Sequence, residues 1–214
     1  QNVIDAALDT NVDKVLLIST DKAVQPINLY GATKLCAEKL FVAANVYRGD
    51  RRTRFSVVRY GNVIGSRGSL IELIKRQRAS GVIPLTDERM TRFLIALDRV
   101  MDAVFNALEY MQGGEIFVPK MKSFRIVDVI KTLAPECKFH IIGIRPGEKI
   151  HEILVTEYET SRTRDIGSLF IIPSQSNDHE WLRDKPFFPS DFSYTSDHPH
   201  CLIPAQEAIE ILNV

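Results

Sequence analysis

The stretch LLISTDKAVQPINLYGATKLCAEKL, residues 16 to 40, decides the fold class of this chain. The unbroken apolar run that begins at Val15 and ends at Ser19 indicates a strand buried on both faces, which is typical of a parallel sheet. A polar loop follows from Thr20 to Asn28, and a long helix is predicted over 29–47. Buried strands that alternate with helices in this way favour an α/β fold with a mostly parallel sheet.

The same alternation continues on both sides of this stretch. Periodicity predicts further helices over 2–10, 69–79, 98–111, 126–133, 149–155 and 205–212, and further strands over 55–60, 115–118, 138–144 and 169–172. The segment 173–204 is rich in Pro, Ser, Asp and His and is expected to be loop-like. The alternation is clearest up to Val118, and the shorter, more mixed elements after it suggest a second lobe.

Composition excludes several classes of protein. The 214 residues carry 27 Lys and Arg against 27 Asp and Glu, so the chain has no basic excess with which to bind nucleic acid electrostatically. A hydrophobic fraction of 45% is sufficient for a core and excludes disorder as the main state. We find no apolar run of about 18 residues that would span a membrane. The 3 cysteines, Cys36, Cys137 and Cys201, form no close pair and are expected to be reduced, buried thiols of a cytoplasmic protein.

Polar residues that can carry chemistry follow the first predicted strand. Ser19, Thr20, Asp21 and Lys22 stand at its C-terminal end, the edge at which open α/β sheets bind ligands. The acid and the amine of Asp21 and Lys22 suit a reaction with separate acid and base steps.

The start of the predicted helix carries a second chemical pair. Tyr30 and Lys34 are four residues apart, so both side chains point the same way. A phenol beside an ammonium becomes a usable base, because the positive charge stabilises the phenolate. The spacing alone is a weak signal, since an ordinary pair on a helix surface gives the same pattern.

The ordered set STDKA (19–23), YGATK (30–34), RYGNVIGSRGS (59–69), MTRF (90–93) and GIRPGEKIHE (143–152) is far more specific. It resembles the extended short-chain dehydrogenase/reductase family and, more narrowly, the inverting UDP-N-acetylglucosamine 4,6-dehydratases of the pseudaminic-acid pathway. The resemblance runs from residue 2 to about 212 and is weakest over 160–189. Membrane-attached relatives often carry Met at the position of Tyr30, and retaining dehydratases usually show Asp-Glu at the position of Asp21-Lys22. Both details favour the inverting, soluble branch.

The resemblance implies a mechanism. Tyr30, assisted by Lys34, would remove the proton of the sugar 4-hydroxyl as hydride passes to NADP⁺. Lys22 would then remove the C5 proton, and Asp21 would protonate the leaving 6-hydroxyl. Thr20 would hold the 4-oxygen or orient the tyrosine. Return of hydride to C6 and reprotonation of C5 from the opposite face would give a UDP-4-keto-6-deoxy-L-hexosamine for a bacterial surface or flagellar glycan.

The resemblance also implies contacts for the cofactor and the substrate. The residues implied for the cofactor are Tyr30, Lys34, Ser19, Tyr60 and Asn62. Those implied for the UDP-sugar are Asn62, Arg67, Arg92, Arg145 and Glu148, because a guanidinium fork matches a diphosphate and a carboxylate binds ribose hydroxyls. Each of these arginines has an alternative interpretation as an ordinary surface residue. His151-Glu152 is half of a zinc-binding helix, but Val155 occupies the place of the second histidine, so no metal site is predicted.

The Gly-rich turn with which this family binds its dinucleotide has no counterpart here, because none of the 11 glycines lie two residues apart. The simplest interpretation is that an N-terminal portion of roughly a hundred residues is absent from this sequence, at about 30 residues per βαβ unit. We then expect 1–66 and 97–118 to form the later half of a doubly wound Rossmann-type domain, and 67–96 and 119–214 to form a substrate-binding lobe. The strand at Val15 would be an exposed edge, and the isolated chain would bind NADP⁺ weakly or not at all.

Three functions remain open from the sequence. The first is the NADP-dependent dehydratase, with NAD as a possible cofactor, a UDP-sugar as substrate and self-association into a homo-oligomer. The second is a UDP-sugar 4-epimerase of the same superfamily, which would share Tyr30 and Lys34 but needs no acid and base for C5 and C6. The third is a catalytically incomplete fragment that only binds sugar nucleotides. Asp21-Lys22 favours the first.

Overall fold

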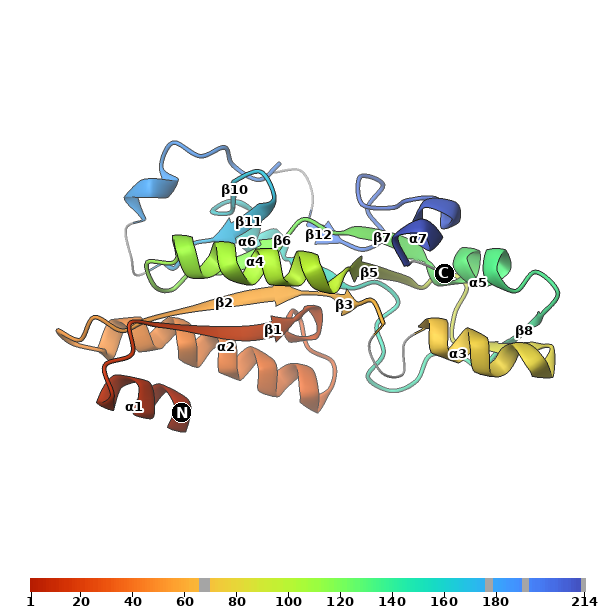
Figure 1. Ribbon diagram of the computed structural model, residues 1–214, viewed down its shortest axis with the longest axis horizontal. Coiled ribbons are helices and arrows are strands. Elements are labelled where there is room, and N and C mark those ends of the chain that lie inside the picture. The colour runs from red at the N-terminus through yellow and green to blue at the C-terminus, as the bar shows by residue number, and fades with distance from the viewer. Residues whose placement is uncertain (66–69, 176–178, 190–192, 213–214) are drawn as a thin grey trace. The chain divides into compact units, whose positions relative to one another are not determined.

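The computed structural model describes residues 1–65, 70–175, 179–189 and 193–212 (Figure 1). The chain divides into two compact units, each built from three segments. Unit 1 comprises Gln1–Tyr60, Arg99–Lys120 and Leu154–Tyr194, and unit 2 comprises Gly61–Asp98, Met121–Ile153 and Thr195–Val214.

Unit 1 is built on a five-stranded sheet with the order β1-β2-β6-β11-β10. Its strands are β1 (Lys14–Thr20), β2 (Arg54–Tyr60), β6 (Ile116–Pro119), β11 (Leu169–Ile172) and β10 (Arg164–Asp165). The first three are parallel, whereas β11 is antiparallel to both of its neighbours. The predicted α/β fold with a mostly parallel sheet is therefore confirmed, and β1 is an edge strand of the sheet that the structure describes.

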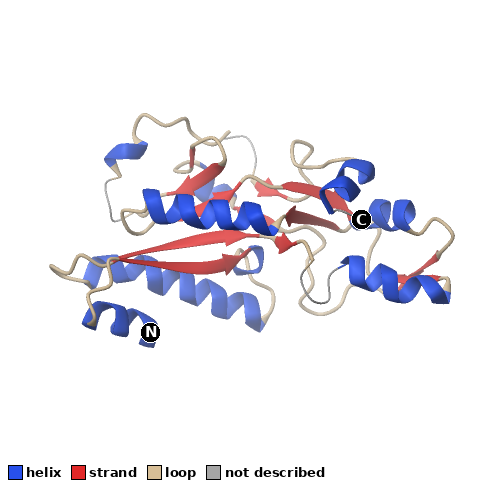
Figure 2. Ribbon diagram, in the orientation of Figure 1, coloured by secondary structure: helices blue, strands red, loops and turns tan. Residues whose placement is uncertain are grey.

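Helices cover both faces of the β1–β2 part of this sheet (Figure 2). The helices α1 (Asn2–Asp9) and α2 (Leu29–Tyr47) lie on one side and α4 (Leu97–Tyr110) on the other. The side chains of β2 point alternately to the two faces of the sheet. Phe55 makes an edge-to-face contact with Phe41 of α2, and Val58 belongs to the core cluster that includes Ala103 and Ala107 of α4.

The position of α2 follows from its first turn. Asn28 has an extended backbone, and its side chain accepts a hydrogen bond of 2.8 Å from the backbone N–H of Gly31, as an N-cap does. Between β1 and α2, residues Asp21–Ala23 form the single 3₁₀ turn η1, with Thr20 as its N-cap. The end of β1 and the start of α2 are thus both fixed by local capping. The remaining helical elements of unit 1 are α6 (Glu157–Thr160) and η3 (Glu180–Leu182).

Unit 2 contains two small sheets. β3 (Asn62–Val63), β5 (Thr91–Ile95) and β7 (Lys122–Arg125) form one, and β4 (Val82–Leu85) and β8 (Lys138–Ile141) form the other. Its helical elements are α3 (Leu70–Gln77), η2 (Arg78–Ser80), α5 (Ile126–Leu133) and α7 (Ala205–Leu212). Their apolar faces share one core cluster, in which Ile74, Ile83, Phe124, Ile130 and Ala208 are buried. Strands β9 (Ile153–Val155) and β12 (Tyr194–Thr195) pair with each other.

Three sequence predictions need correction. The helix expected over 149–155 is wrong, because residues 153–155 form β9, where the apolar run Ile-Leu-Val pairs with β12. The segment 154–194, expected in the second lobe, belongs to unit 1, since β11 pairs with β6 and extends its sheet. Cys137 and Cys201 are buried free thiols as expected, but Cys36 is exposed on α2. Within the ranges described, every helix is too short or too polar to cross a bilayer.

Candidate active site

Thr20, Asp21 and Lys22 form a hydrogen-bonded cluster where β1 ends. The Thr20 hydroxyl donates to Asp21 Oδ1 at 2.8 Å, and Lys22 Nζ donates to the same oxygen at 3.0 Å. The Asp21 side chain is fully buried, whereas that of Lys22 is 35% exposed. Asp21 Oδ2 is buried and accepts no hydrogen bond from any described residue. The cluster therefore presents an amine to solvent and keeps one carboxylate oxygen unused.

The first two turns of α2 lie against this cluster. Lys34 Nζ donates to the carbonyl oxygen of Ile18 in β1 at 3.1 Å. Gly31 lies so close to the backbone of Lys22 that a Cβ at this position would overlap the Lys22 carbonyl oxygen. Only glycine fits there, because the obstacle is backbone and has no flexible end to move aside. The structure thus brings the two predicted pairs, Asp21-Lys22 and Tyr30-Lys34, onto adjoining segments.

Tyr30 affects the pKa of Tyr60 at this end of the sheet. Tyr30 is 53% exposed. Burial raises the pKa of the Tyr60 phenol, and its electrostatic interaction with Tyr30 raises it further. Tyr60 ends β2, next to Thr20 in the parallel register of β1 and β2. The predicted cofactor-contacting residues Ser19, Tyr30, Lys34 and Tyr60 therefore all lie at the C-terminal ends of these strands or on the helix that follows.

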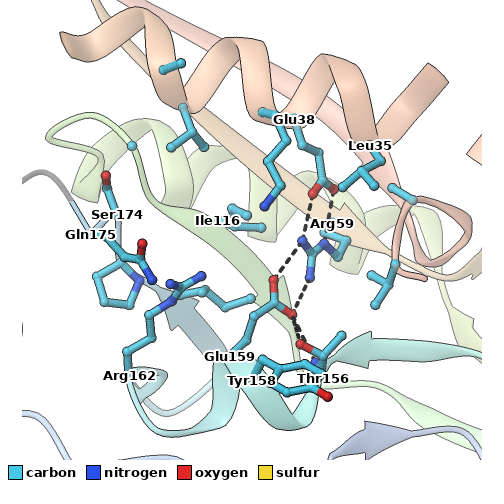
Figure 3. Close-up of a pocket in the computed structure, with 18 of the residues that line it drawn as sticks. Leu35, Glu38, Arg59, Ile116, Thr156, Tyr158, Glu159, Arg162, Ser174 and Gln175 are labelled. Atoms are coloured by element: carbon cyan, nitrogen blue, oxygen red, sulfur yellow. Dashed lines mark hydrogen bonds and ion pairs between the residues drawn. The ribbon is translucent and has the colours of Figure 1, made fainter. Parts of the chain in front are cut away.

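A buried ionic triad, Glu38–Arg59–Glu159, lies behind this edge (Figure 3). Arg59 Nη2 donates to Glu38 Oε2 at 2.7 Å and Arg59 Nε to Glu38 Oε1 at 3.1 Å. The same guanidinium donates to both oxygens of Glu159 at 3.2 Å and to the carbonyl oxygen of Leu154 at 2.8 Å. Burial by itself lowers the pKa of Arg59, but the two carboxylates outweigh burial and raise it above its usual range.

Glu159 also accepts hydrogen bonds from Thr156. The backbone N–H and hydroxyl of Thr156 donate to Glu159 Oε2 at 3.0 Å, which completes the capping box of α6. Burial alone raises the pKa of Glu159, but the charge and hydrogen bonds of Arg59 outweigh it and hold that pKa below its usual range. A cavity of about 700 Å³ adjoins the triad, between α2 and the segments 156–162 and 172–175 (Figure 3).

The sequence analysis did not identify this triad. Arg59 is separated from Glu38 by 21 residues and from Glu159 by 100 along the chain. The available signal was a charged residue inside the apolar run of β2, because a buried arginine requires buried carboxylate partners.

The predicted substrate contacts lie in unit 2. Asn62 and Arg92 line one small cavity of about 70 Å³. Arg92 Nη1 donates to the carbonyl oxygens of Thr91 and Ile150, at 2.7 and 3.1 Å. Arg145 lies farther along the chain, 64% exposed, with its Nη1 3.8 Å from Glu148 Oε1. Arg67 lies outside the described residues.

Glu152 is a further charged residue near Arg92, and the sequence analysis gave it no role in substrate binding. It is buried, with Oε1 3.8 Å from Arg92 Nε and Oε2 4.0 Å from Lys149 Nζ. Glu152 therefore joins the arginine of the MTRF motif to the GEKIHE segment. Beside it, Thr91 is hydrogen-bonded to His151 Nδ1 at 2.9 Å and to Ser196 at 2.6 Å.

Comparisons with known proteins agree on one family. The family described as "Polysaccharide biosynthesis protein" matches residues 1–174. A UDP-N-acetylglucosamine 4,6-dehydratase (inverting) of Campylobacter jejuni is 45% identical over the whole chain, which spans 67% of that relative. A UDP-glucose 4-epimerase of Rickettsia canadensis is 38% identical over 86% of the chain, and the match covers 55% of that relative.

Solved structures give the same fold. The structure of Pen from Bacillus thuringiensis matches with a TM-score of 0.86 at 36% identity, over all of this chain and 66% of its own. The chain thus spans about two thirds of the length of these most similar proteins. More distant structures of this fold, at 18 and 20% identity with TM-scores of 0.61 and 0.55, contain bound NAD or NADPH.

Proposed function

The chain belongs to the family of polysaccharide biosynthesis proteins, and from that membership we propose that it is part of an inverting UDP-N-acetylglucosamine 4,6-dehydratase. The reaction removes water across C5 and C6 of the sugar and inverts C5, giving a UDP-4-keto-6-deoxy-L-hexosamine. The inverting dehydratase of Campylobacter jejuni, 45% identical over the whole chain, supports this function.

The Asp21–Lys22 ion pair is the observation that carries the proposal. Loss of water needs a base for the C5 proton and an acid for the 6-hydroxyl. Transfer of one proton over the 3.0 Å between Lys22 Nζ and Asp21 Oδ1 supplies both, because it leaves a neutral amine and a protonated carboxyl without changing the net charge. The half-exposed amine then takes the C5 proton, and the buried carboxyl donates its proton to the departing 6-oxygen.

Tyr30 and Thr20 act at C4 in this proposal. The Tyr30 phenolate receives the proton of the 4-hydroxyl and becomes a phenol, and Lys34 stabilises the phenolate by its charge. Lys34 is oriented for this by its 3.1 Å hydrogen bond to Ile18 O. Thr20 holds the 4-oxygen or orients Tyr30, and its hydroxyl also donates to Asp21.

A nicotinamide dinucleotide, which would accept hydride from C4 and return it to C6, fits the residues present in part. Tyr30, Lys34, Ser19, Tyr60 and Asn62 are the residues that would hold its nicotinamide half. Asp21 Oδ2 is a buried polar atom at this edge that accepts no hydrogen bond from a described residue. The family's phosphate-binding Gly-rich turn is not in this sequence, so these residues supply only part of the cofactor site. We propose NADP, with NAD as the alternative.

The UDP moiety is assigned to unit 2. Arg92, Arg145, Arg67 and Asn62 are proposed as diphosphate and sugar contacts, and Glu148 as the ligand of a ribose hydroxyl. Arg145 supports this assignment best, because its guanidinium is 64% exposed and only loosely paired.

A UDP-sugar 4-epimerase is the second candidate, favoured by the Rickettsia canadensis relative. Such an enzyme needs the Tyr30 and Lys34 chemistry but has no step at C5 or C6. The Asp21–Lys22 pair would have no role in a 4-epimerase, which is why we place the dehydratase first. The third candidate, a fragment that binds sugar nucleotides without turning them over, is separated from both by the assay below.

The deciding experiment is incubation of the protein with UDP-N-acetylglucosamine and NADP⁺ in D₂O, followed by mass spectrometry and NMR. The dehydratase gives a product that has lost one water, carries deuterium at C5 and has the L configuration there. An epimerase gives a product of unchanged mass inverted at C4. Recovery of the D configuration at C5 would contradict the inverting branch, and unreacted sugar would mean that this chain alone does not catalyse the reaction, the outcome that favours the third candidate.

We further propose a homo-oligomer in the cytoplasm. α2 leaves Leu40 and Tyr47, which are seven residues apart and share a helical face, 41 and 49% exposed, and a second copy would cover this apolar face. The free thiols of Cys137 and Cys201 support a reducing compartment. Light scattering of the wild type and of Tyr47→Glu tests the oligomer: the variant is expected to dissociate.

A further inference from the structure

We infer that Glu38 is a positioning residue for the proposed reaction: through Ser19 it fixes the end of β1, and with it the Thr20–Asp21–Lys22 cluster, against the helix that carries Tyr30 and Lys34. This inference rests on the proposed function for its catalytic consequence but not for its structural one.

The contact between Ser19 and Glu38 is short and buried. The Ser19 hydroxyl donates to Glu38 Oε1 at 2.6 Å, and both residues are 3% exposed or less. A hydrogen bond to a charged acceptor in a buried site is among the stronger ones in proteins. Ser19 immediately precedes Thr20, so its position determines where the backbone leaves the sheet.

Glu38 lies on the same helical face as Lys34 and Tyr30, at successive intervals of four residues. The contacts of α2 with the end of β1 and the turn η1 include Lys34 on Ile18 O, Glu38 on the Ser19 hydroxyl, and Gly31 against Lys22 O. Lys34 is long and solvated at its tip, and Gly31 contributes only close approach. The Glu38–Ser19 contact is therefore the buried, directional member of the three.

Arg59 holds Glu38 rigid from the opposite side. Two hydrogen bonds from the guanidinium, at 3.1 and 2.7 Å, fix both carboxylate oxygens, and Arg59 is itself held by Glu159 and Leu154 O (Figure 3). A carboxylate fixed in this way cannot follow a displaced serine. Arg59 of β2 and Glu159 of α6 thus hold Glu38 in place, and Glu38 in turn holds Ser19 at the end of β1.

Glu159 offers a matched control. It is the other carboxylate of Arg59 and is also buried, but it is further held by Thr156, the N-cap of α6, and not by Ser19. Glu159→Gln and Glu38→Gln each remove one negative charge from the same arginine. Glutamine also preserves the capping box at Glu159. A purely structural role predicts the same outcome for both variants.

The test is a pair of double-mutant cycles that combine Ser19→Ala with Glu38→Gln and, separately, with Glu159→Gln. The first readout is amide hydrogen exchange of Lys22 in η1 and of Val24, which caps η1 at its C-terminal end, and it requires neither cofactor nor turnover. We expect Glu38→Gln and Ser19→Ala each to speed this exchange at least about 3-fold, and the double variant to be no faster than Glu38→Gln alone. Glu159→Gln is expected to leave it within about 2-fold and to combine additively with Ser19→Ala.

The second readout is the kinetics of the holoenzyme. Glu38→Gln is expected to lower kcat about 10-fold with KM within about 2-fold, because misplaced acid and base groups act on the chemical step. Glu38→Asp, which keeps the charge but shortens the side chain, is expected to lower kcat less. Equal effects of Glu38→Gln and Glu159→Gln on η1 exchange, or additivity with Ser19→Ala, would overturn the inference. If coupling is found in exchange but the protein turns over no sugar nucleotide, the proposed function fails and the positioning contact stands.

Discussion

Gly31 and Lys22 are in backbone contact: the first turn of α2 meets the carbonyl oxygen of Lys22 so closely that no side chain fits between them. This contact joins the residues that act at C4 in the proposed reaction to those that act at C5 and C6. It also explains why glycine follows Tyr30 in the YGATK motif.

Gly31→Ala is therefore expected to destabilise the protein by about 1–3 kcal/mol, because the methyl group forces α2 away from η1. The free energy of unfolding in urea measures the loss. Thr33→Ala, an exposed substitution on the same helix, is expected to stay within about 0.5 kcal/mol of the wild type. A Gly31→Ala variant as stable as the wild type would show that the contact can relax.

Lys22→Met is expected to lower dehydratase kcat by at least about 100-fold, since the general base for C5 is removed while the apolar stem is kept. Deuterium incorporation at C5 of the sugar in D₂O is expected to disappear with it. Lys39→Met, which removes an exposed lysine of α2, is the control and should keep both. Full activity in Lys22→Met would remove Lys22 from the mechanism.

Arg59→Met is expected to cost about 3–5 kcal/mol of stability, because it leaves Glu38 and Glu159 buried and facing each other without a cation. Thermal or urea unfolding measures the cost. Arg52→Met is the matched control: Arg52 is paired with Asp13 at 2.7 Å, but its side chain is 75% exposed. An exposed pair contributes little, so a change of at most about 0.5 kcal/mol is expected. Similar losses for the two variants would contradict the role of burial.

Glu115 is expected to make the protein sensitive to acid. It accepts hydrogen bonds from the Ser56 hydroxyl at 2.6 Å and from the backbone N–H groups of Gln112 and Gly113 at 2.8 Å, and lies 3.2 Å from His179 Nδ1. Burial alone raises the pKa of Glu115, but these partners outweigh it and hold the pKa below its usual range. The unfolded chain, with an ordinary glutamate pKa of about 4.3, then binds the proton first as the pH falls.

The stabilisation by Glu115 is consequently complete above the unfolded-state pKa and is lost as the pH falls through the lower, folded-state value. Urea unfolding between pH 7 and pH 3 is expected to show a shallower acid limb in Glu115→Gln than in the wild type. Glu136→Gln, at a half-exposed carboxylate paired with Arg78, should change the limb less, because solvent screens an exposed pair. Parallel curves for Glu115→Gln and the wild type would refute the assignment.

The elements predicted best from sequence are those with local signals. α2 was predicted over 29–47, the range observed, because Asn28 caps it and its apolar period is long. In unit 2, strands β3, β4, β5 and β7 were missed, since they have 2 to 5 residues each and pair with partners distant in sequence, whereas β8 was predicted within 138–144. The prediction of a helix over 149–155 was wrong because β9 pairs with β12, a strand distant in sequence.

In the candidate site, too, residues close together in sequence were predicted and residues far apart were not. Thr20, Asp21, Lys22, Tyr30 and Lys34 lie within 15 residues, so strand-end and helix-spacing arguments place them correctly on adjoining segments. Their catalytic roles stay a prediction. The Glu38–Arg59–Glu159 triad depends on contacts across up to 100 residues, which neither composition nor periodicity encodes.

The interleaving of the two units has a consequence for biosynthesis. Unit 1 takes its strands from three separate stretches, with two stretches of unit 2 between them. On the ribosome, β1 and β2 emerge long before β11, which begins at residue 169, so the early strands must wait with an unfinished sheet while most of unit 2 is made. Neither unit can be produced by a single cut, and a recombination event that exchanged one would need five crossovers, one at each boundary between the segments. The pair is therefore constrained to fold, and to evolve, as one inseparable gene segment.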